Sequence, residues 1–330
     1  MRLSKGMVRD PFRALQLLRH TYKNWLGIAA CYFARRPLGA AVLKNGLSIP
    51  LDRKPSSLRA SLRHYHRWYD PSIYNLIGLA RLLGEGWEIK SVEPDYLLLS
   101  PDSSTMIKCR LNQGTDISLL GEIFIRGVYG SDFTGKTVVD VGAYTGDSAV
   151  YFSQRGARLV VALEPDPKNY ELALENVRMN GLTDRVKLVN LALSVETGES
   201  KIAVNLETPN ITQLENSGHN SANTIEISTV TVDELMNRFG LSNIDVLKMN
   251  CEGCEYGIIR NMPVRTLQSI GEILLEFHEG PKDLPEILSR NGFDIQIRGG
   301  TFGYLTAKRT QDEAPLTTSK RPTSITTPSA

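Results

Sequence analysis

The sequence predicts an α/β protein in which a doubly wound, mostly parallel sheet follows a smaller N-terminal region of helix and strand. The main observation is a change of pattern near residue 137. After it, short apolar runs alternate with segments of helical periodicity, which is typical of strands joined by crossover helices. Before it, in residues 37–110, the runs are shorter and are separated by turn signals. Those shorter runs indicate a small β-containing region that precedes the main sheet.

The expected elements of the main sheet follow from the period of the apolar residues. Strands are expected at 137–141, 158–164, 186–191, 244–249 and 271–277, and helices at 147–155, 167–180, 232–239, 254–261 and 282–291. Two further strands, 201–205 and 225–230, are expected in an insertion, where the polar loop 207–223 is long enough to lie over a site. Alternation at 294–297 and 302–307 predicts a C-terminal antiparallel hairpin.

Residues 1–36 are expected to form one basic amphipathic helix. Its apolar stripe recurs at three- and four-residue intervals through Val8, Phe12, Leu15, Leu18, Tyr22, Trp25, Ala29 and Phe33. Two interpretations stay open: the stripe packs on the rest of the protein, or it contacts a membrane interface through residues 8–36. The distribution of charge leaves both interpretations open. Residues 1–68 carry 14 Lys and Arg against 2 Asp and Glu, and the rest of the chain has a net charge of −10, so the basic segment can bind either an anionic partner or the acidic main domain.

Four regions are expected along the chain. They are the amphipathic helix at 1–36, a small α/β region at 37–120, the main domain at 121–309 and a tail at 310–330. In the second region, Asn45-Gly46 is a hairpin signal, and residues 96–99 and 106–109 have the pattern of a strand pair. In the tail, 12 of the 21 residues are Ser, Thr or Pro, which is typical of disorder.

The cysteines and the apolar segments predict a cytoplasmic setting. Four cysteines do not make the framework of a disulfide-rich domain in a chain of 330 residues. No signal-peptide pattern is present. The first apolar stretch holds only 11 uncharged residues, and crossing a bilayer takes about 20. Any membrane association through residues 8–36 would therefore be peripheral.

Acids and glycines follow the first two strands of the predicted sheet. Asp140 lies just before Gly142, and the loop ends at Gly146. Glycines let a ligand approach the backbone, but the G-x-G-x-x-G spacing of a dinucleotide site is absent. An acid at position 140 suits a ligand with an amino group, and Glu164, after the second strand, can accept both hydroxyls of a ribose. S-adenosylmethionine fits this description of a nucleoside without phosphates.

Several segments in register make the sequence resemble a known family. They read DVGAYTGDSAVYF, VVALEPDPKNYELALENVRMNG, VNLALSVETGE, STVTVDEL, IDVLKMNCEGCEYGIIRNM and ILLEFHEG. In this order, across residues 123–293, they are similar to the FkbM family of S-adenosylmethionine-dependent methyltransferases. The resemblance covers about half of the chain. It implies a Rossmann-like class I methyltransferase fold.

The resemblance also implies roles for single residues. The methionine end of the cofactor would be lined by Asp140, Gly142, Ala143, Tyr144 and Gly146. Glu164 would hold the ribose, and the adenine would be flanked by Asn190, Leu191 and Ala192. Val195 stands where the family often has an acid, which removes one adenine contact.

Residues 247–259, LKMNCEGCEYGII, contain a C-x-x-C pair that has three interpretations. It is a redox pair, half of a zinc site, or two small apolar residues packed at the end of a strand. We favour packing, because cysteine is readily buried as a small hydrophobe. Cys31 and Cys109 are too isolated to complete a zinc set, so no metal site is predicted.

The expected catalytic residues are Asn250, Glu252 and His278, with His278 as the general base because its ordinary pKa suits proton transfer near neutral pH. Asn250 departs from the family pattern, in which Asp usually stands at this position. Asparagine keeps the size and the hydrogen bonding of aspartate but loses its charge. A cofactor-binding protein with weak or no catalysis is therefore the alternative to an enzyme.

The expected function is methylation of a hydroxyl on a small-molecule or glycan acceptor, which the resemblance implies to be a sugar, glycan, lipid-linked saccharide or secondary metabolite. A nicotinamide oxidoreductase is disfavoured because the phosphate-binding glycines are missing. Nucleic acid is not expected as a partner, because the main domain is acidic.

Overall fold

The predicted parallel sheet is the centre of the fold. The computed structural model describes residues 11–34, 39–51, 71–203, 213–214 and 224–310. Its largest sheet has the strand order β15-β16-β14-β13-β6-β7-β8. The strands are β6 Thr137–Val141, β7 Leu159–Leu163, β8 Val186–Val189, β13 Ile244–Met249, β14 Ile270–Phe277, β15 Phe293–Gly299 and β16 Gly303–Arg309. Among these strands β16 pairs antiparallel with β14 and with β15, and the other pairings are parallel, which confirms the mostly parallel sheet with a C-terminal hairpin.

Helices cover both faces of this sheet because successive side chains of a strand point to opposite faces. Val138 and Val160 share a core with residues of two helices, α5 Asp147–Gln154 and α6 Pro167–Met179. Val139 and Val161, one position further along, share another core with residues of α7 Val232–Phe239, α8 Cys254–Asn261, α9 Val264–Gln268 and α10 Leu284–Arg290. The doubly wound, Rossmann-like arrangement is thereby confirmed.

A smaller sheet forms the predicted insertion. Its strand order is β11-β10-β12-β9, with β9 Ala192–Leu193, β10 Gly198–Ala203, β11 Gln213–Leu214 and β12 Thr224–Val230. The antiparallel pairing of β10 with β12 confirms the two expected strands. The loop between them is described only at residues 213–214, and the tail only at Thr310. The predictions of a loop over the site and of a disordered tail therefore fall outside the described residues.

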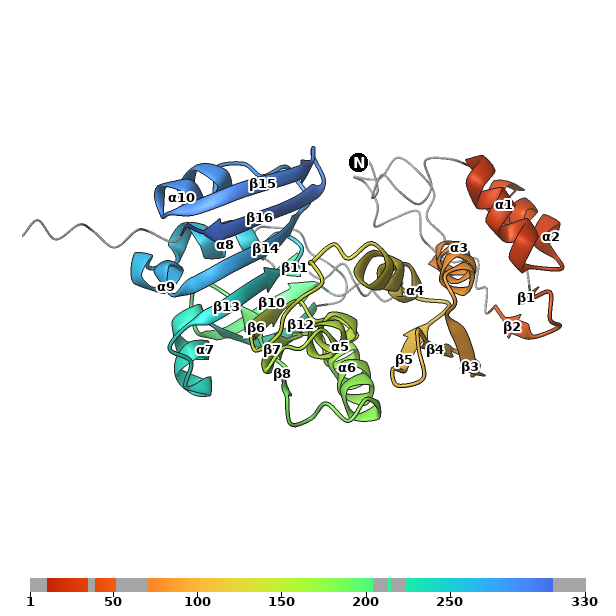
Figure 1. Cartoon of the computed structure of the whole chain (residues 1–330), viewed down its shortest axis with the longest axis horizontal. Coiled ribbons are helices and arrows are strands. Elements are labelled where there is room, and N and C mark those ends of the chain that lie inside the picture. The colour runs from red at the N-terminus through yellow and green to blue at the C-terminus, as the bar shows by residue number, and fades with distance from the viewer. Residues whose placement is uncertain (1–10, 35–38, 52–70, 204–212, 215–223, 311–330) are drawn as a thin grey trace, which may run out of the picture.

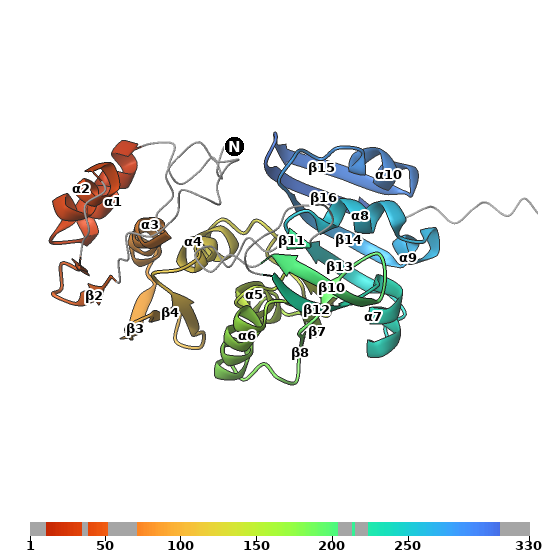
Figure 2. The same cartoon turned by 180° about the vertical axis from the view of Figure 1, so that it is seen from behind.

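The N-terminal region has its own core and lies at the opposite end of the molecule from β15 and α10 (Figures 1 and 2). Its elements are α1 Pro11–Thr21, α2 Trp25–Ala34, β1 Ala40–Val42, β2 Ser48–Pro50, α3 Pro71–Gly84, β3 Glu88–Val92, β4 Tyr96–Ser100 and β5 Ile107–Arg110. Antiparallel pairing of β1 with β2 and of β4 with β5 confirms the expected hairpin and strand pair. A short helix, α4 Asp116–Leu120, and a π-helical turn, η1 Gly121–Ile125, lead to the main sheet.

The single helix expected over residues 1–36 is wrong, because α1 and α2 are separate helices. The residues between the two helices bind the β1–β2 hairpin and do not continue the helix. Asn24 Nδ2 donates to the carbonyl of Ala40 at 2.9 Å, and Asn24 Oδ1 accepts from the Val42 N–H at 2.8 Å. Tyr22 forms an antiparallel bridge with Leu43. These tertiary contacts outweigh the helical periodicity of the sequence.

Part of the predicted apolar stripe packs on the rest of the protein. Leu18 and Tyr22 are buried, and the Tyr22 hydroxyl donates to the carbonyl of Leu76 in α3 at 2.9 Å. Phe12 and Leu26 are largely exposed. None of the helices in the described ranges is long and apolar enough to cross a membrane. Contact of the N-terminal segment with a membrane surface stays a prediction.

Candidate functional site

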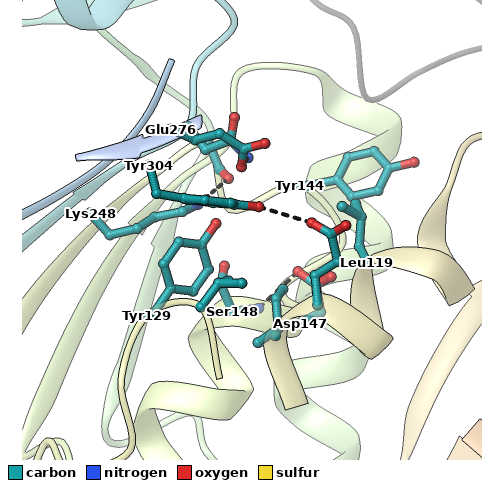
Figure 3. A pocket seen from close by; sticks show the side chains of 13 residues that line it. Leu119, Tyr129, Tyr144, Asp147, Ser148, Lys248, Glu276 and Tyr304 are labelled. Carbon is teal, nitrogen blue, oxygen red and sulfur yellow. Dashed lines mark hydrogen bonds between the residues drawn. The ribbon is translucent and has the colours of Figure 1, made fainter. Parts of the chain in front are cut away.

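A pocket lies where the strand order of the main sheet reverses. From β6 the chain continues outward through β7 and β8, and from β13 it continues the other way through β14. Ligands of open α/β sheets bind outside the carboxyl ends of the strands at such a point. The pocket measures about 340 Å³ with its mouth included. Its lining, partly shown in Figure 3, is Leu119, Glu122, Ile123, Val128, Tyr129, Gly142, Tyr144, Asp147, Ser148, Lys248, Asn250, Glu276 and Tyr304.

Two glycines of the loop after β6 have no room for a side chain. Gly142 has a φ of 76°, and a Cβ there would lie 2.0 Å from the carbonyl oxygen of Asn250. Gly146 has a φ of 78° and precedes α5, where a Cβ would lie 3.0 Å from the Cα of Ala173. Both glycines were predicted to admit a ligand. In the structure they allow close approach of other backbone segments of the protein, and Gly142 also lines the pocket.

A buried lysine, Lys248, forms an ion pair with the carboxylate of Asp140. Lys248 Nζ lies 2.7 Å from Asp140 Oδ1, and both side chains are almost fully buried. Lys248 also donates to the carbonyl of Gly142 at 2.7 Å, and the Ser148 hydroxyl donates to Asp140 Oδ2 at 2.6 Å. Asp140 itself is not among the lining residues, whereas Lys248 is. No role was predicted for Lys248, although a lysine inside an apolar strand is a signal of a buried charge pair.

Tyr144 is held in the pocket by residues of the N-terminal region. Its φ of 50° is uncommon for a residue with a side chain. The Tyr144 hydroxyl donates to Asp116 Oδ1 at 2.5 Å, and the guanidinium of Arg110 lies 4.9 Å from the ring centroid. Arg110 and Asp116 form a buried ion pair at 2.9 Å. The loop after β6 is therefore anchored to the segment between β5 and α4.

Glu164 follows β7 and is buried, with 4% of its surface exposed. Its carboxylate accepts hydrogen bonds from the N–H groups of Tyr144 at 2.8 Å and Asp166 at 3.0 Å, and from Asn169 Nδ2 at 3.3 Å. Burial raises the pKa of Glu164 to about 7, although the three donors favour its charged form. Glu164 is not among the pocket-lining residues, so its role with a ribose stays a prediction.

The residues expected beside an adenine lie next to Glu164. Asn190 follows β8 and is exposed, and its Nδ2 donates to the carbonyls of Glu164 at 2.8 Å and Pro165 at 2.9 Å. Leu191 is half-buried and Ala192 is buried. The structure thus brings the expected ribose and adenine residues together at the ends of β7 and β8.

Of the three expected catalytic residues, only Asn250 lines the pocket. Its Nδ2 donates to Glu276 Oε2 at 2.7 Å. Glu252 and His278 lie together outside the lining, with 3.5 Å between Glu252 Oε1 and His278 Nε2. Burial raises the pKa of Glu252 to about 8 and lowers the pKa of His278 to about 4. The two side chains therefore form an uncharged pair near neutral pH.

Three acids, Glu122, Asp147 and Glu276, also line the pocket. Glu122 Oε2 accepts a hydrogen bond from the Tyr304 hydroxyl at 2.9 Å. Asp147 Oδ2 is buried without a hydrogen-bond partner among the described residues, and burial raises the pKa of Asp147 to about 7. Burial, followed by the charges of Glu122 and Glu252, raises the pKa of Glu276 well above its ordinary value. A cationic group that enters the pocket would favour the charged form of these desolvated acids.

The favoured interpretation of Cys251 and Cys254 as packed free cysteines is wrong. They form a disulfide, with 5.5 Å between their Cα atoms. The backbone explains why: Glu252 has a φ of 55° and Gly253 a φ of 115°, so the turn folds back and brings the two side chains together. Residue type alone favours packing, because it does not encode the backbone angles of this turn.

Comparison with known proteins finds a family match for one part of the chain. Residues 140–295 match the family model described as the methyltransferase FkbM domain. Hexuronic acid methyltransferase AglP of Haloferax volcanii is 26% identical over 160 residues, which are 48% of this chain and 63% of that protein. Ribosomal protein L11 methyltransferase of Alteromonas mediterranea is 36% identical over 87 residues, which are 26% of this chain and 30% of that protein.

One solved structure that matches part of this chain is also described as a methyltransferase FkbM. The crystal structure of methyltransferase FkbM from Methylobacillus flagellatus has a TM-score of 0.38 and 17% sequence identity, and the match covers 52% of this chain and 43% of that chain. This chain thus spans less than two thirds of the length of each of the three proteins.

Proposed function

Residues 140–295 belong to the methyltransferase FkbM family, and from this premise we propose that the protein transfers the methyl group of S-adenosylmethionine to a hydroxyl of a sugar-containing acceptor. The observation that carries the proposal is the position of the pocket, at the strand ends where this sheet reverses its order. The name of the hexuronic acid methyltransferase relative supports a sugar-containing acceptor over other hydroxyl compounds.

In this proposal the cofactor lies along the carboxyl ends of β6, β7 and β8. Its methionine end contacts the loop that follows β6, where Tyr144 lines the pocket. Its ribose hydroxyls bind Glu164, and Asn190 lies beside the adenine. Asp147, with its unpartnered buried oxygen, is the side chain placed to receive the cationic amino group. The positive charge of the sulfonium would in turn favour the charged form of the pocket acids, whose pKa burial raises.

Methyl transfer is an in-line displacement, so much of the catalysis is alignment of the acceptor oxygen with the methyl group. We assign proton removal from the acceptor to His278, held by Glu252. His278 is uncharged near neutral pH and so has a nitrogen that can accept a proton, although the pKa of about 4 makes it a weaker base than an ordinary histidine. Glu276 lines the pocket, but burial raises its pKa well above the ordinary value and so disfavours the carboxylate form that a base needs. His278→Ala should lower turnover more than Glu276→Gln does, and the reverse order would move the base to Glu276.

A second candidate function is cofactor binding without catalysis. The observation in its favour is that Asn250 donates to Glu276 at 2.7 Å. Aspartate at position 250 would face the Glu276 carboxyl, and two adjacent carboxyls share a proton or bind a cation. Asparagine removes both possibilities and leaves a fixed neutral contact.

Calorimetry and a product assay separate the two functions. Titration with S-adenosylhomocysteine tests the site, and release of that product from S-adenosylmethionine tests turnover on a panel of uronic-acid and neutral oligosaccharides. Binding together with turnover supports the enzyme. Binding without turnover, combined with a large gain in activity for Asn250→Asp, supports the second function. Absence of binding to either compound contradicts both.

A further inference from the structure

The Cys251–Cys254 pair lies at the start of a helix, in a setting that differs from that of the other two cysteines. Cys254 is the first residue of α8, which has eight residues, and both Cys251 and Cys254 are half-buried. A helix N-terminus stabilises a thiolate, and a C-x-x-C spacing lowers a thiol pKa further. Cys31 and Cys109 are both buried, and burial raises the pKa of Cys109 well above its ordinary value.

A buried carboxylate lies against this disulfide. Glu255 is fully buried, and its Oε2 lies 3.3 Å from Cys251 Sγ and accepts a hydrogen bond from the Gly253 N–H at 3.0 Å. Glu255 Oε1 is buried and has no hydrogen-bond partner among the described residues. Burial raises the pKa of Glu255 to about 7. A disulfide sulfur has no proton to donate, whereas a thiol at Cys251 would supply one to this carboxylate.

We propose that Cys251 and Cys254 are a reversible dithiol–disulfide couple in which Glu255 carries the proton. A thiolate of an external dithiol attacks Cys254 Sγ, and the bond between the two protein sulfurs breaks. Cys251 leaves and takes the proton of the Glu255 carboxyl. The second thiolate of the reductant then attacks the mixed disulfide and releases Cys254 as a thiolate, which takes a proton from water. Two electrons pass to the protein, and the reductant ends as a disulfide.

The couple is connected to the pocket through the residue before it. Asn250 lines the pocket, its N–H donates to the carbonyl of Val141 at 3.1 Å, and its carbonyl lies against Gly142. A Cβ on Gly142 would lie 3.7 Å from the Cα of Cys251. Reduction frees the turn that begins at Cys251 and so changes the support of the loop after β6. This last step, an effect on cofactor affinity, rests on the proposed function.

The couple is tested on the full chain in buffers of reduced and oxidised dithiothreitol, with EDTA present, followed by alkylation and peptide mass spectrometry. Cys251 and Cys254 should become alkylated together as the ratio rises and should reoxidise when it falls, while Cys31 and Cys109 stay unchanged. Glu255→Gln should slow reduction at pH 7 by roughly tenfold or more, with Glu175→Gln on the exposed side of α6 as the matched control. A pair that resists excess dithiothreitol in the folded protein overturns the proposal, as does an unchanged rate in Glu255→Gln.

The link to the pocket has a separate measurement. S-adenosylhomocysteine affinity is compared between the oxidised chain, the reduced chain and the Cys251→Ser, Cys254→Ser double variant. The reduced chain and the double variant should agree with each other and differ from the oxidised chain by threefold or more. Equal affinities in all three contradict the link. Absence of binding in all three counts against the proposed function and leaves the dithiol titration as the test of the couple.

Discussion

The two walls of the pocket are built in different ways. The sheet wall is made of Gly142, Tyr144, Asp147, Ser148, Lys248, Asn250 and Glu276, all within the family match of 140–295. The outer wall is made of Leu119, Glu122, Ile123, Val128, Tyr129 and Tyr304, all outside that match. Figure 3 shows Tyr304 and Tyr129 beside Lys248, facing Tyr144, Leu119 and Asp147.

The two walls differ in how far a substitution in each would disturb the main sheet. In the sheet wall, the Asp140–Lys248 ion pair and the close approach at Gly142 tie β6 to β13, so a substitution disturbs the sheet itself. In the outer wall, Glu122 bonds to Tyr304 at 2.9 Å and to Arg126 at 3.3 Å, and none of the three is part of the parallel strands. We infer that the sheet wall serves the cofactor and that the outer wall is where acceptor specificity changes.

The largest effect is expected from breaking the ion pair of the sheet wall. Lys248→Met leaves the buried Asp140 carboxylate unpaired, and removal of one partner of a buried pair costs about 3–5 kcal/mol. Denaturant unfolding monitored by circular dichroism measures the change. Lys308→Met is the matched control, because the Lys308 side chain is 66% exposed and its partner Glu272 keeps a second pair with Lys136, so the loss should be less than about 1 kcal/mol. Equal losses in the two variants would remove the distinction.

The buried carboxyls should make stability depend on pH. Burial raises the pKa of Glu252 to about 8 and of Asp147 and Glu164 to about 7. The folded protein thus keeps protons that the unfolded chain has released, and the free energy of unfolding falls as the pH rises from about 4.5 to about 8. His278 acts the other way between pH 4 and 6.5, because its pKa is lowered to about 4.

Glu164→Gln measures the share of one carboxyl in this pH dependence. Glutamine keeps the acceptor oxygen but does not titrate, so the variant should lose on the order of 2 kcal/mol of the change between pH 5 and pH 8. Urea unfolding at both pH values gives the result. A variant with the same pH dependence as the natural chain would show that Glu164 is not the protonated group.

The cofactor assignment in the sheet region is tested by Glu164→Ala. Loss of the carboxylate that is proposed to hold the ribose should weaken S-adenosylhomocysteine binding by tenfold or more, measured by calorimetry. Glu175→Ala, an exposed acid on α6 that pairs with Lys108, serves as the control and should bind normally. Unchanged affinity in Glu164→Ala removes the ribose assignment.

The smallest effect is expected in the outer wall. Tyr304→Phe removes the hydrogen bond to Glu122 and should lower turnover about fivefold, because a typical intramolecular hydrogen bond contributes about 1 kcal/mol. Cofactor affinity should stay within about twofold. Tyr96→Phe, in β4 of the N-terminal region, is the control. A loss of cofactor affinity in Tyr304→Phe would show that the two walls do not divide their roles.

Much of the main sheet was predictable because its signals are local. The bounds expected for β6, β13, α7 and α8 are those of the structure. Apolar runs of strand length and helical periodicity need only neighbouring residues. The acids and glycines at the strand ends were found for the same reason, because the end of an apolar run marks the sheet edge where ligands bind.

The sequence by itself therefore determined the order of strands and helices, the doubly wound sheet and the edge where the pocket lies. Only the tertiary structure decided that Lys248 neutralises Asp140, that Tyr304 reaches Glu122 across 182 residues, and that the N-terminal helix is two helices. It also decided that Cys251 and Cys254 are bonded, since this depends on positive φ values in the turn between them. Each of these features depends on contacts or backbone angles that residue type and periodicity do not encode.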